Sequence, residues 1–303
     1  MTGGAAMVGT QENGPSVTSP DSVTTHPIVV GVDSTPSSLF AVEWAAAEAA
    51  ARHEQLHIVH SWSWPHLAPW LTSADHLVRE DLQRAGESLL RSYRIAARDA
   101  GATQITSAVR EGPAHEVLDE LSEDAAMVVV GSHHVGGLAR TVLGSTSRAV
   151  AGAAVSPVIV VNTRAGAARR PSRLAVGIAA LPSDEKVLRF AFGYAHQHHL
   201  PMDVLFCWDG GDPPLVHVPV PASARAWLAE SVAGWRGEYP DVPMQVSVHA
   251  VHAVTGLLAA GGTDGLIVVG RRAHRPPVLG SHLGSVSLGV IHHAECAIAI
   301  VPT

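Results

Sequence analysis

Short runs of apolar residues alternate with longer stretches of helical periodicity along most of the chain. Residues 28–33 (IVVGVD) form a continuous β-rich run, which is typical of a strand buried on both faces of a sheet. An Ala-rich helical stretch follows as far as Ala51, and Ser37 or Ser38 stands where a residue could cap that helix. Strands that alternate with helices predict an α/β fold with a doubly wound parallel sheet and right-handed crossovers.

The same alternation predicts the remaining elements. Further strands are expected at 57–62, 105–109, 127–131 and 158–161, and further helices at 74–101, 113–122 and 146–153. Gly101 ends the long amphipathic helix, and Pro113 opens the next one. The second half follows the same order with shorter segments, including a helix at 223–239 and a brief one at 254–260.

The chain is an internal duplication. Residues 28–32 (IVVGV) recur as 174–178 (LAVGI), 146 positions later, and Trp62 recurs as Trp208 at the same offset. Residues 128–131 (VVVG) match 267–270 (IVVG), residues 144–147 (GSTS) match 284–287 (GSVS), and 157–161 match 297–301. Such matches in one order are the signature of a repeat architecture. We therefore expect two domains, at 27–163 and 174–303, joined by a solvated basic linker at 164–173.

Composition is consistent with this picture and excludes several functions. With 47% hydrophobic and 16% charged residues, the 303-residue chain is typical of a globular protein. The net charge of -7 argues against a nucleic-acid partner. Residues 1–26 are rich in Gly, Ser, Thr and Pro, which predicts a disordered tail without a targeting sequence. No apolar run is long enough to span a membrane, and the two cysteines, Cys207 and Cys296, fit a reducing cytoplasm.

A candidate ligand site lies where the strand order of such a sheet reverses, beyond the carboxyl ends of the strands. Three segments of the first repeat meet there: residues 31–34 (GVDS), the end of the second strand near His60, and the loop 131–147. Gly144-Ser145-Thr146 opens a helix. Backbone N–H groups, hydroxyl donors and the positive end of the helix dipole together favour a phosphate group.

In these motifs the chain resembles the universal stress protein family, over both repeats and nearly all of residues 27–303. The resemblance implies two Rossmann-like domains, of the kind called adenine-nucleotide α-hydrolase-like. ATP-binding members carry Gly, two residues, Gly, nine residues, Gly, then Ser or Thr, and an Asp ends their first strand. Gly131, Gly144, Ser145 and Asp33 match that pattern, and Thr146 follows in the same turn. The resemblance therefore implies ATP as the ligand of the first repeat.

Two histidines add to the expected site. His134 replaces the middle glycine of the motif, so that its imidazole could either crowd the phosphate or donate a hydrogen bond to it. His60 is expected to line the adenine pocket from its position alone. The 19 histidines do not predict a metal site, because adjacent pairs such as His133-His134 diverge and no carboxylate or thiolate joins them at ligand spacing.

The second repeat departs further from the motif. Ala179 stands in the place of Asp33, the loop 270–284 is one residue longer than 131–144, and it contains Pro276-Pro277, which lack N–H donors. Gly284-Ser285 still opens a helix. This repeat is expected to be structural or to bind something other than ATP.

Three functions remain open at this stage. The first is a non-enzymatic, ATP-binding regulatory module of the stress response that acts through protein partners. The second is an enzyme, such as an ATP pyrophosphatase, but Val29-Val30-Gly31 stands where its Ser-Gly-Gly run belongs, and no P-loop or general base pair is visible. The third is a nucleotide-free interaction protein. The resemblance also implies that 158–161 and 297–301 pair antiparallel as an intramolecular pseudo-dimer, and that two such chains form a homodimer.

Overall fold

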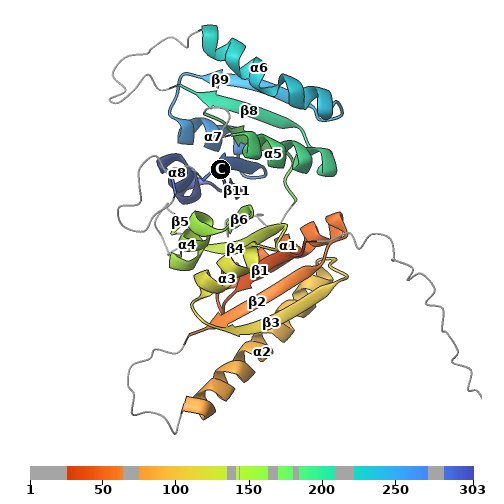
Figure 1. Cartoon of the computed structure of the whole chain (residues 1–303), viewed down its shortest axis with the longest axis vertical. Helices are drawn as coiled ribbons and strands as arrows, with labels where there is room; N and C mark the ends of the chain where they lie inside the picture. Colours follow the sequence, from red (N-terminus) through yellow and green to blue (C-terminus); the bar gives the residue numbers. More distant parts are fainter. Residues whose placement is uncertain are drawn as a thin grey trace, which may run out of the picture.

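A computed structural model gives the fold of the chain (Figure 1). It describes residues 26–63, 75–134, 141–142, 144–162, 170–179, 184–208, 222–271 and 283–303. The tail expected at 1–26 lies outside these residues except for its last position, and most of the expected linker does as well.

The first repeat alternates strands and helices in the predicted order. Its elements are β1 (Ile28–Val32), α1 (Pro36–Arg52), β2 (Leu56–Trp62), α2 (Asp75–Asp99), β3 (Ile105–Glu111), α3 (Ala114–Ser122), β4 (Met127–His134), β5 (Thr141–Val142), α4 (Ser145–Ala153) and β6 (Val158–Asn162).

The second repeat reproduces this order. Its elements are β7 (Leu174–Gly177), α5 (Glu185–His198), β8 (Met202–Cys207), α6 (Ala222–Glu238), β9 (Met244–His249), α7 (Ala253–Gly261), β10 (Leu266–Gly270), α8 (Ser285–His293) and β11 (Ala297–Val301).

All the main strands belong to one continuous sheet in the order β3-β2-β1-β4-β6-β11-β10-β7-β8-β9. Within each repeat the neighbouring strands are parallel. The first repeat therefore has the doubly wound order 3-2-1-4-6 and the second the matching order 9-8-7-10-11. The strand order reverses between β1 and β4, and again between β7 and β10, so each repeat has its own crevice for a ligand.

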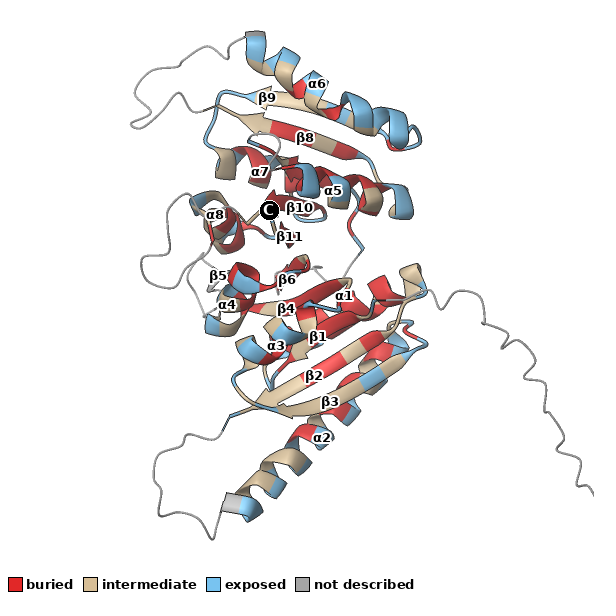
Figure 2. Ribbon diagram, in the orientation of Figure 1, coloured by how far each residue is buried: buried red, intermediate tan, exposed pale blue. Residues whose placement is uncertain are grey.

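Helices cover both faces of the sheet, and the core on each face runs through both repeats (Figure 2). Alternate residues of one strand serve opposite faces: Val30 belongs to the core that includes residues of α1, α2, α5 and α6, whereas Val29 belongs to the core that includes residues of α3, α4, α7 and α8. Because β1, β6, β10 and β11 are covered on both sides, their sequences read as nearly continuous apolar runs.

The two repeats are joined through their last strands, as the sequence predicts. β6 pairs antiparallel with β11 in the register Val158↔Ile300, Ile159↔Ala299 and Val160↔Ile298. Figure 1 shows both strands in the middle of the molecule, between the two sets of helices. Every residue of both strands is buried. The pairing satisfies the backbone groups of two apolar edges that would otherwise promote aggregation.

Two local expectations are wrong in detail. The cap of α1 is Thr35, not Ser37 or Ser38, because Pro36 sets the first helical position and moves both serines into the first turn. The loop expected from Gly131 onwards begins later, since β4 continues to His134 and pairs antiparallel with β5. The sequence does not predict β5, which is only two residues long.

A buried polar cluster also connects the repeats. The Glu48 carboxylate on α1 accepts hydrogen bonds from Tyr194 Oη at 3.1 Å and from His198 Nε2 at 3.0 Å, both on α5, and pairs with Arg52 on its own helix. Burial raises the pKa of Glu48, but the His198 hydrogen bond and the Arg52 charge outweigh it and lower that pKa below 4.5. Burial in turn raises the pKa of the Tyr194 hydroxyl well above 10.0, which keeps it a donor.

Glu48→Gln should lower the free energy of unfolding at pH 7 by about 2 kcal/mol, because it removes the charge that organises these donors. A carboxyl with a lowered pKa in the folded state stabilises the protein above its unfolded pKa, and that contribution is lost as the pH falls through the folded value. The difference between wild type and variant should therefore shrink below about pH 4. Urea unfolding followed by circular dichroism measures this difference in the free energy of unfolding.

Glu43→Gln, at a half-exposed position of the same helix, is the control. A loss equal to that of the control, or one independent of pH, would contradict the assignment.

Candidate functional site

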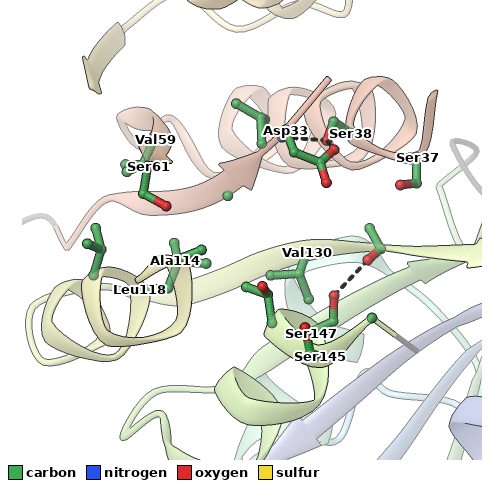
Figure 3. Close-up of a pocket in the computed structure, with 16 residues that line it drawn as sticks. Asp33, Ser37, Ser38, Val59, Ser61, Ala114, Leu118, Val130, Ser145 and Ser147 are labelled. Carbon is green, nitrogen blue, oxygen red and sulfur yellow. Dashed lines mark hydrogen bonds between the residues drawn. The ribbon is translucent and has the colours of Figure 1, made fainter. Parts of the chain in front are cut away.

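A cavity of about 220 Å³ lies at the switch point of the first repeat, between the carboxyl ends of β1 and β4 and the beginnings of α1 and α4 (Figure 3). One wall is apolar and comes from strands and from α3. The rest is polar and consists of hydroxyls, a carboxylate and glycine backbone. The lining residues are Gly31, Val32, Asp33, Ser37, Ser38, Val59, Ser61, Ala114, Val117, Leu118, Val130, Gly131, Gly144, Ser145, Thr146 and Ser147.

Asp33 organises the turn between β1 and α1. Its Oδ1 accepts hydrogen bonds from the Thr35 backbone N–H at 2.9 Å and from Ser38 Oγ at 2.7 Å, and Thr35 Oγ1 lies against the same oxygen. Tyr93 Oη on α2 donates to the Asp33 carbonyl at 2.8 Å. The structure therefore holds the exposed carboxylate in one place at the mouth of the cavity.

Gly131 permits a close approach of backbone to backbone. A Cβ built on it would lie 2.7 Å from the Ser37 carbonyl oxygen and 2.9 Å from its carbon. This glycine is thus required for packing β4 against the first turn of α1, whatever ligand the cavity takes. Ser147 Oγ donates to the Gly131 carbonyl at 2.9 Å, which fixes α4 to the same strand (Figure 3).

The beginning of α4 presents its N-terminus to the cavity. Gly144 is the N-cap, without a side-chain cap, and Ser145 and Thr146 form the first turn. The first N–H groups of a helix have no partner within it, so this end attracts an anion. Among the described residues outside its own chain neighbours, the nearest atom to a Cβ on Gly144 would be Ser147 Oγ at 4.0 Å.

The structure brings together Asp33, Gly131, Gly144, Ser145 and Thr146, but not His60. His60 does not line the cavity: alternation along β2 points Val59 and Ser61 into it, while His60 Nδ1 bonds the Val32 carbonyl at 2.9 Å. The far edge of its ring faces Gly86 of α2. The structure therefore places His60 outside this cavity, contrary to the expectation from its position in the sequence. The backbone of His134 pairs with Thr141 in the β4–β5 ladder, so the role of its imidazole stays a prediction.

The second repeat forms a cavity of about 460 Å³ at the equivalent switch point. Its carboxylate comes from Asp184, which precedes α5 and is 3% exposed. The sequence pairs Asp184 with Ser38, as it pairs Ala179 with Asp33, so the alignment of the repeats could have revealed this residue. The strand-end position, Ala179, does not by itself indicate a carboxylate at this cavity. The loop with Pro276-Pro277 lies outside the described residues.

The residues that the structure describes also bear on a metal site and on a membrane-spanning helix. Within those ranges, no three His, Cys, Asp or Glu side chains come together as a metal site would require. Likewise, the described helices include none with the length and apolar character needed to cross a membrane.

The fold and its two crevices define a class: tandem α/β domains that share one sheet, each with a candidate ligand cavity at its strand switch. The model of the universal stress protein family matches residues 24–162 and again 172–302. The chain belongs to this family. A universal stress protein of Mycolicibacterium smegmatis is 33% identical over 291 residues, which cover 92% of this chain and 98% of that protein.

Further relatives agree with the tandem arrangement. Universal stress protein Rv2005c of Mycobacterium tuberculosis is 30% identical over 294 residues, covering 91% of this chain and 96% of the relative. The crystal structure of a universal stress protein from Archaeoglobus fulgidus superimposes with a TM-score of 0.69 at 17% identity, over 92% of this chain and 96% of that one. This last likeness concerns the fold alone.

Gly131→Ala should destabilise the protein by about 1–3 kcal/mol, because the added methyl group overlaps the Ser37 backbone and neither element can move away freely. Gly193→Ala is the matched control. Nothing lies within 4 Å of a Cβ at that position in α5, so the same change there should stabilise by about 0.5–1 kcal/mol. Thermal unfolding distinguishes the two. Equal effects of both substitutions would show that the close approach does not constrain position 131.

Proposed function

We propose that the chain is an ATP-binding regulatory module of the stress response, in which the first cavity holds one nucleotide and protein partners read its state. The observation that carries the proposal is the polar end of that cavity. Gly144, Ser145 and Thr146 place an uncapped helix N-terminus and two hydroxyls beside the glycine of β4. Backbone donors and hydroxyls in this arrangement suit a phosphate chain.

The other end of the cavity suits the remainder of a nucleotide. Val59, Leu118 and Val130 form an apolar wall on which a base can lie, and the Ser61 hydroxyl stands at its edge. The Asp33 carboxylate at the mouth is an acceptor for ribose hydroxyls. A ligand with an apolar ring, a diol and a phosphate chain meets a matching group at each of these places.

The cavity supports binding more than turnover. Among the side chains that the structure describes, the lining contains one carboxylate and no histidine, so these side chains offer no pair of groups to take a proton from water and to assist the leaving group. We therefore propose a non-enzymatic role in the cytoplasm, exerted through partners and in a homodimer of these pseudo-dimeric chains. The competing function is a nucleotide-free interaction protein, and it is an outcome of the tests below.

Gly144→Asp should abolish ATP binding, with at least about a hundredfold loss of affinity, because it places a negative charge at the phosphate end of the cavity. Folding should survive, since no described residue other than its chain neighbours comes closer than 4.0 Å to a Cβ at this position. Isothermal titration calorimetry measures the affinity. Gly284→Asp, the same substitution at the matching position of the second repeat, is the control and should leave ATP binding unchanged. Unchanged affinity in Gly144→Asp would refute the site.

His134→Gly decides between the two roles of this imidazole. If the ring crowds the phosphate, the substitution should tighten ATP binding by about fivefold, which corresponds to about 1 kcal/mol. If the ring donates a hydrogen bond, the substitution should weaken binding, and more strongly at a pH at which the imidazole is charged. We expect crowding. Should neither protein bind ATP at millimolar concentration, the interaction-protein function replaces the proposed one.

A further inference from the structure

We propose that the cavity of the second repeat is a separate binding site for an uncharged nitrogen heterocycle that carries an N–H or O–H donor, and that it excludes phosphate esters. The cavity is about 460 Å³, against about 220 Å³ in the first repeat, and lies within the range of ligand pockets. Its position at the strand switch of a parallel sheet is where such folds bind ligands.

The apolar walls of the two cavities correspond residue by residue. The wall formed by Val59, Leu118 and Val130 in the first repeat is formed by Leu205, Leu257 and Val269 in the second. All three residues of the second wall are almost completely buried from solvent. A surface that suits a flat apolar ring is therefore present in both repeats. The choice of a heterocycle rests on the proposed function, because it transfers the base-binding wall from the first cavity to the second.

The phosphate-binding groups are changed, in contrast. Thr146 in the first cavity corresponds to Val286, and Ser61 corresponds to Cys207, so that two hydroxyls are lost from the lining. The loss of the Thr146 hydroxyl removes a donor from the phosphate end of the cavity, and the loss of the Ser61 hydroxyl removes one from the edge of the base wall.

The cavity carboxylate also stands at a different position in the second repeat, because Asp184 takes the place of Ser38 and Ala179 takes the place of Asp33. Asp184 Oδ2 accepts a hydrogen bond from the Ala179 N–H at 2.6 Å, where in the first repeat Ser38 Oγ accepts one from Asp33 N–H at 2.9 Å. A Cβ built on Gly270, the counterpart of Gly131, would lie 3.6 Å from Asp184 Oδ1. A buried charge this close to the loop glycine repels an anion strongly, because little water screens it. The same oxygens attract a neutral ligand that donates a hydrogen bond.

Cys207 supplies a local reporter of this cavity. It lines the cavity, is partly exposed and forms no disulfide. Cys296 is an internal reference, because burial raises the pKa of its thiol to about 12 and leaves the side chain almost inaccessible. In the folded chain iodoacetamide should therefore modify Cys207 much faster than Cys296.

The experiment follows alkylation of Cys207 in the full chain by mass spectrometry, with adenosine or ATP as the probe. Adenosine at millimolar concentration should slow the modification by about fivefold or more, whereas ATP at the same concentration should slow it by less than about twofold. Asp184→Asn should reduce this preference, because it removes the charge. Asp241→Asn, which removes an exposed carboxylate of the same repeat outside the cavity, should leave it unchanged.

Protection by ATP equal to that by adenosine, or protection by neither, would overturn the proposal. If Asp184→Asn fails to fold, the comparison of the two probes on the unmutated chain still decides, since it needs no variant. The result is independent of the first cavity. Loss of ATP affinity in Gly144→Asp tests the proposed function, while protection of Cys207 reports only on the second cavity.

Discussion

The antiparallel pairing of β6 with β11 is the constraint on which the rest of the structure depends. A single repeat of this fold ends in an apolar edge strand, and both β6 and β11 consist wholly of buried residues. Neither edge could face water without exposing apolar side chains and unpaired backbone groups. By joining the edges within one chain, the duplication turns two half-sheets into one sheet with cores that run through both halves.

This joint leaves the two ligand crevices independent. Each lies at the strand switch of its own repeat, away from the shared edge, and the lining residues of each cavity come from its own repeat. The two cavities differ in their lining residues. The first keeps hydroxyls at the beginning of α4 and a carboxylate at the mouth of its cavity. The second has Val286 and Cys207 in the place of two hydroxyl side chains. It also has the buried carboxylate of Asp184 at the position of Ser38. These exchanges are the basis for proposing ATP as the ligand of the first cavity and an uncharged heterocycle as the ligand of the second.

The sequence predicted the architecture well because the relevant signals are strong and local. Apolar runs and Gly or Pro boundaries placed the main strands and helices to within a few residues. The internal repeat predicted two domains, and the family resemblance implied the strand pairing that joins them. Short or local features gave weaker signals. β5 has only two residues, and α1 begins at Pro36, before the two serines that were expected to cap it.

The candidate site was predicted less completely. Gly131, Gly144, Ser145 and Thr146 were expected at the first cavity from the predicted strand order and from the motif of the family that the chain resembles. The direction of His60 depends on the pleat of β2, and the role of Asp184 depends on a contact across a turn between β7 and α5. Neither a motif nor a composition reports such contacts, although alignment of the two repeats marks position 184 as different. The packing role of Gly131 against Ser37 is likewise a property of the assembled fold.

The central claim is that this pseudo-symmetric chain binds ATP in one repeat and not in the other. Equilibrium dialysis of the purified full chain against saturating radiolabelled ATP tests it most directly. The expected result is a plateau of one ATP per chain. Two equivalent ATP molecules per chain, or none at millimolar ATP, would contradict it.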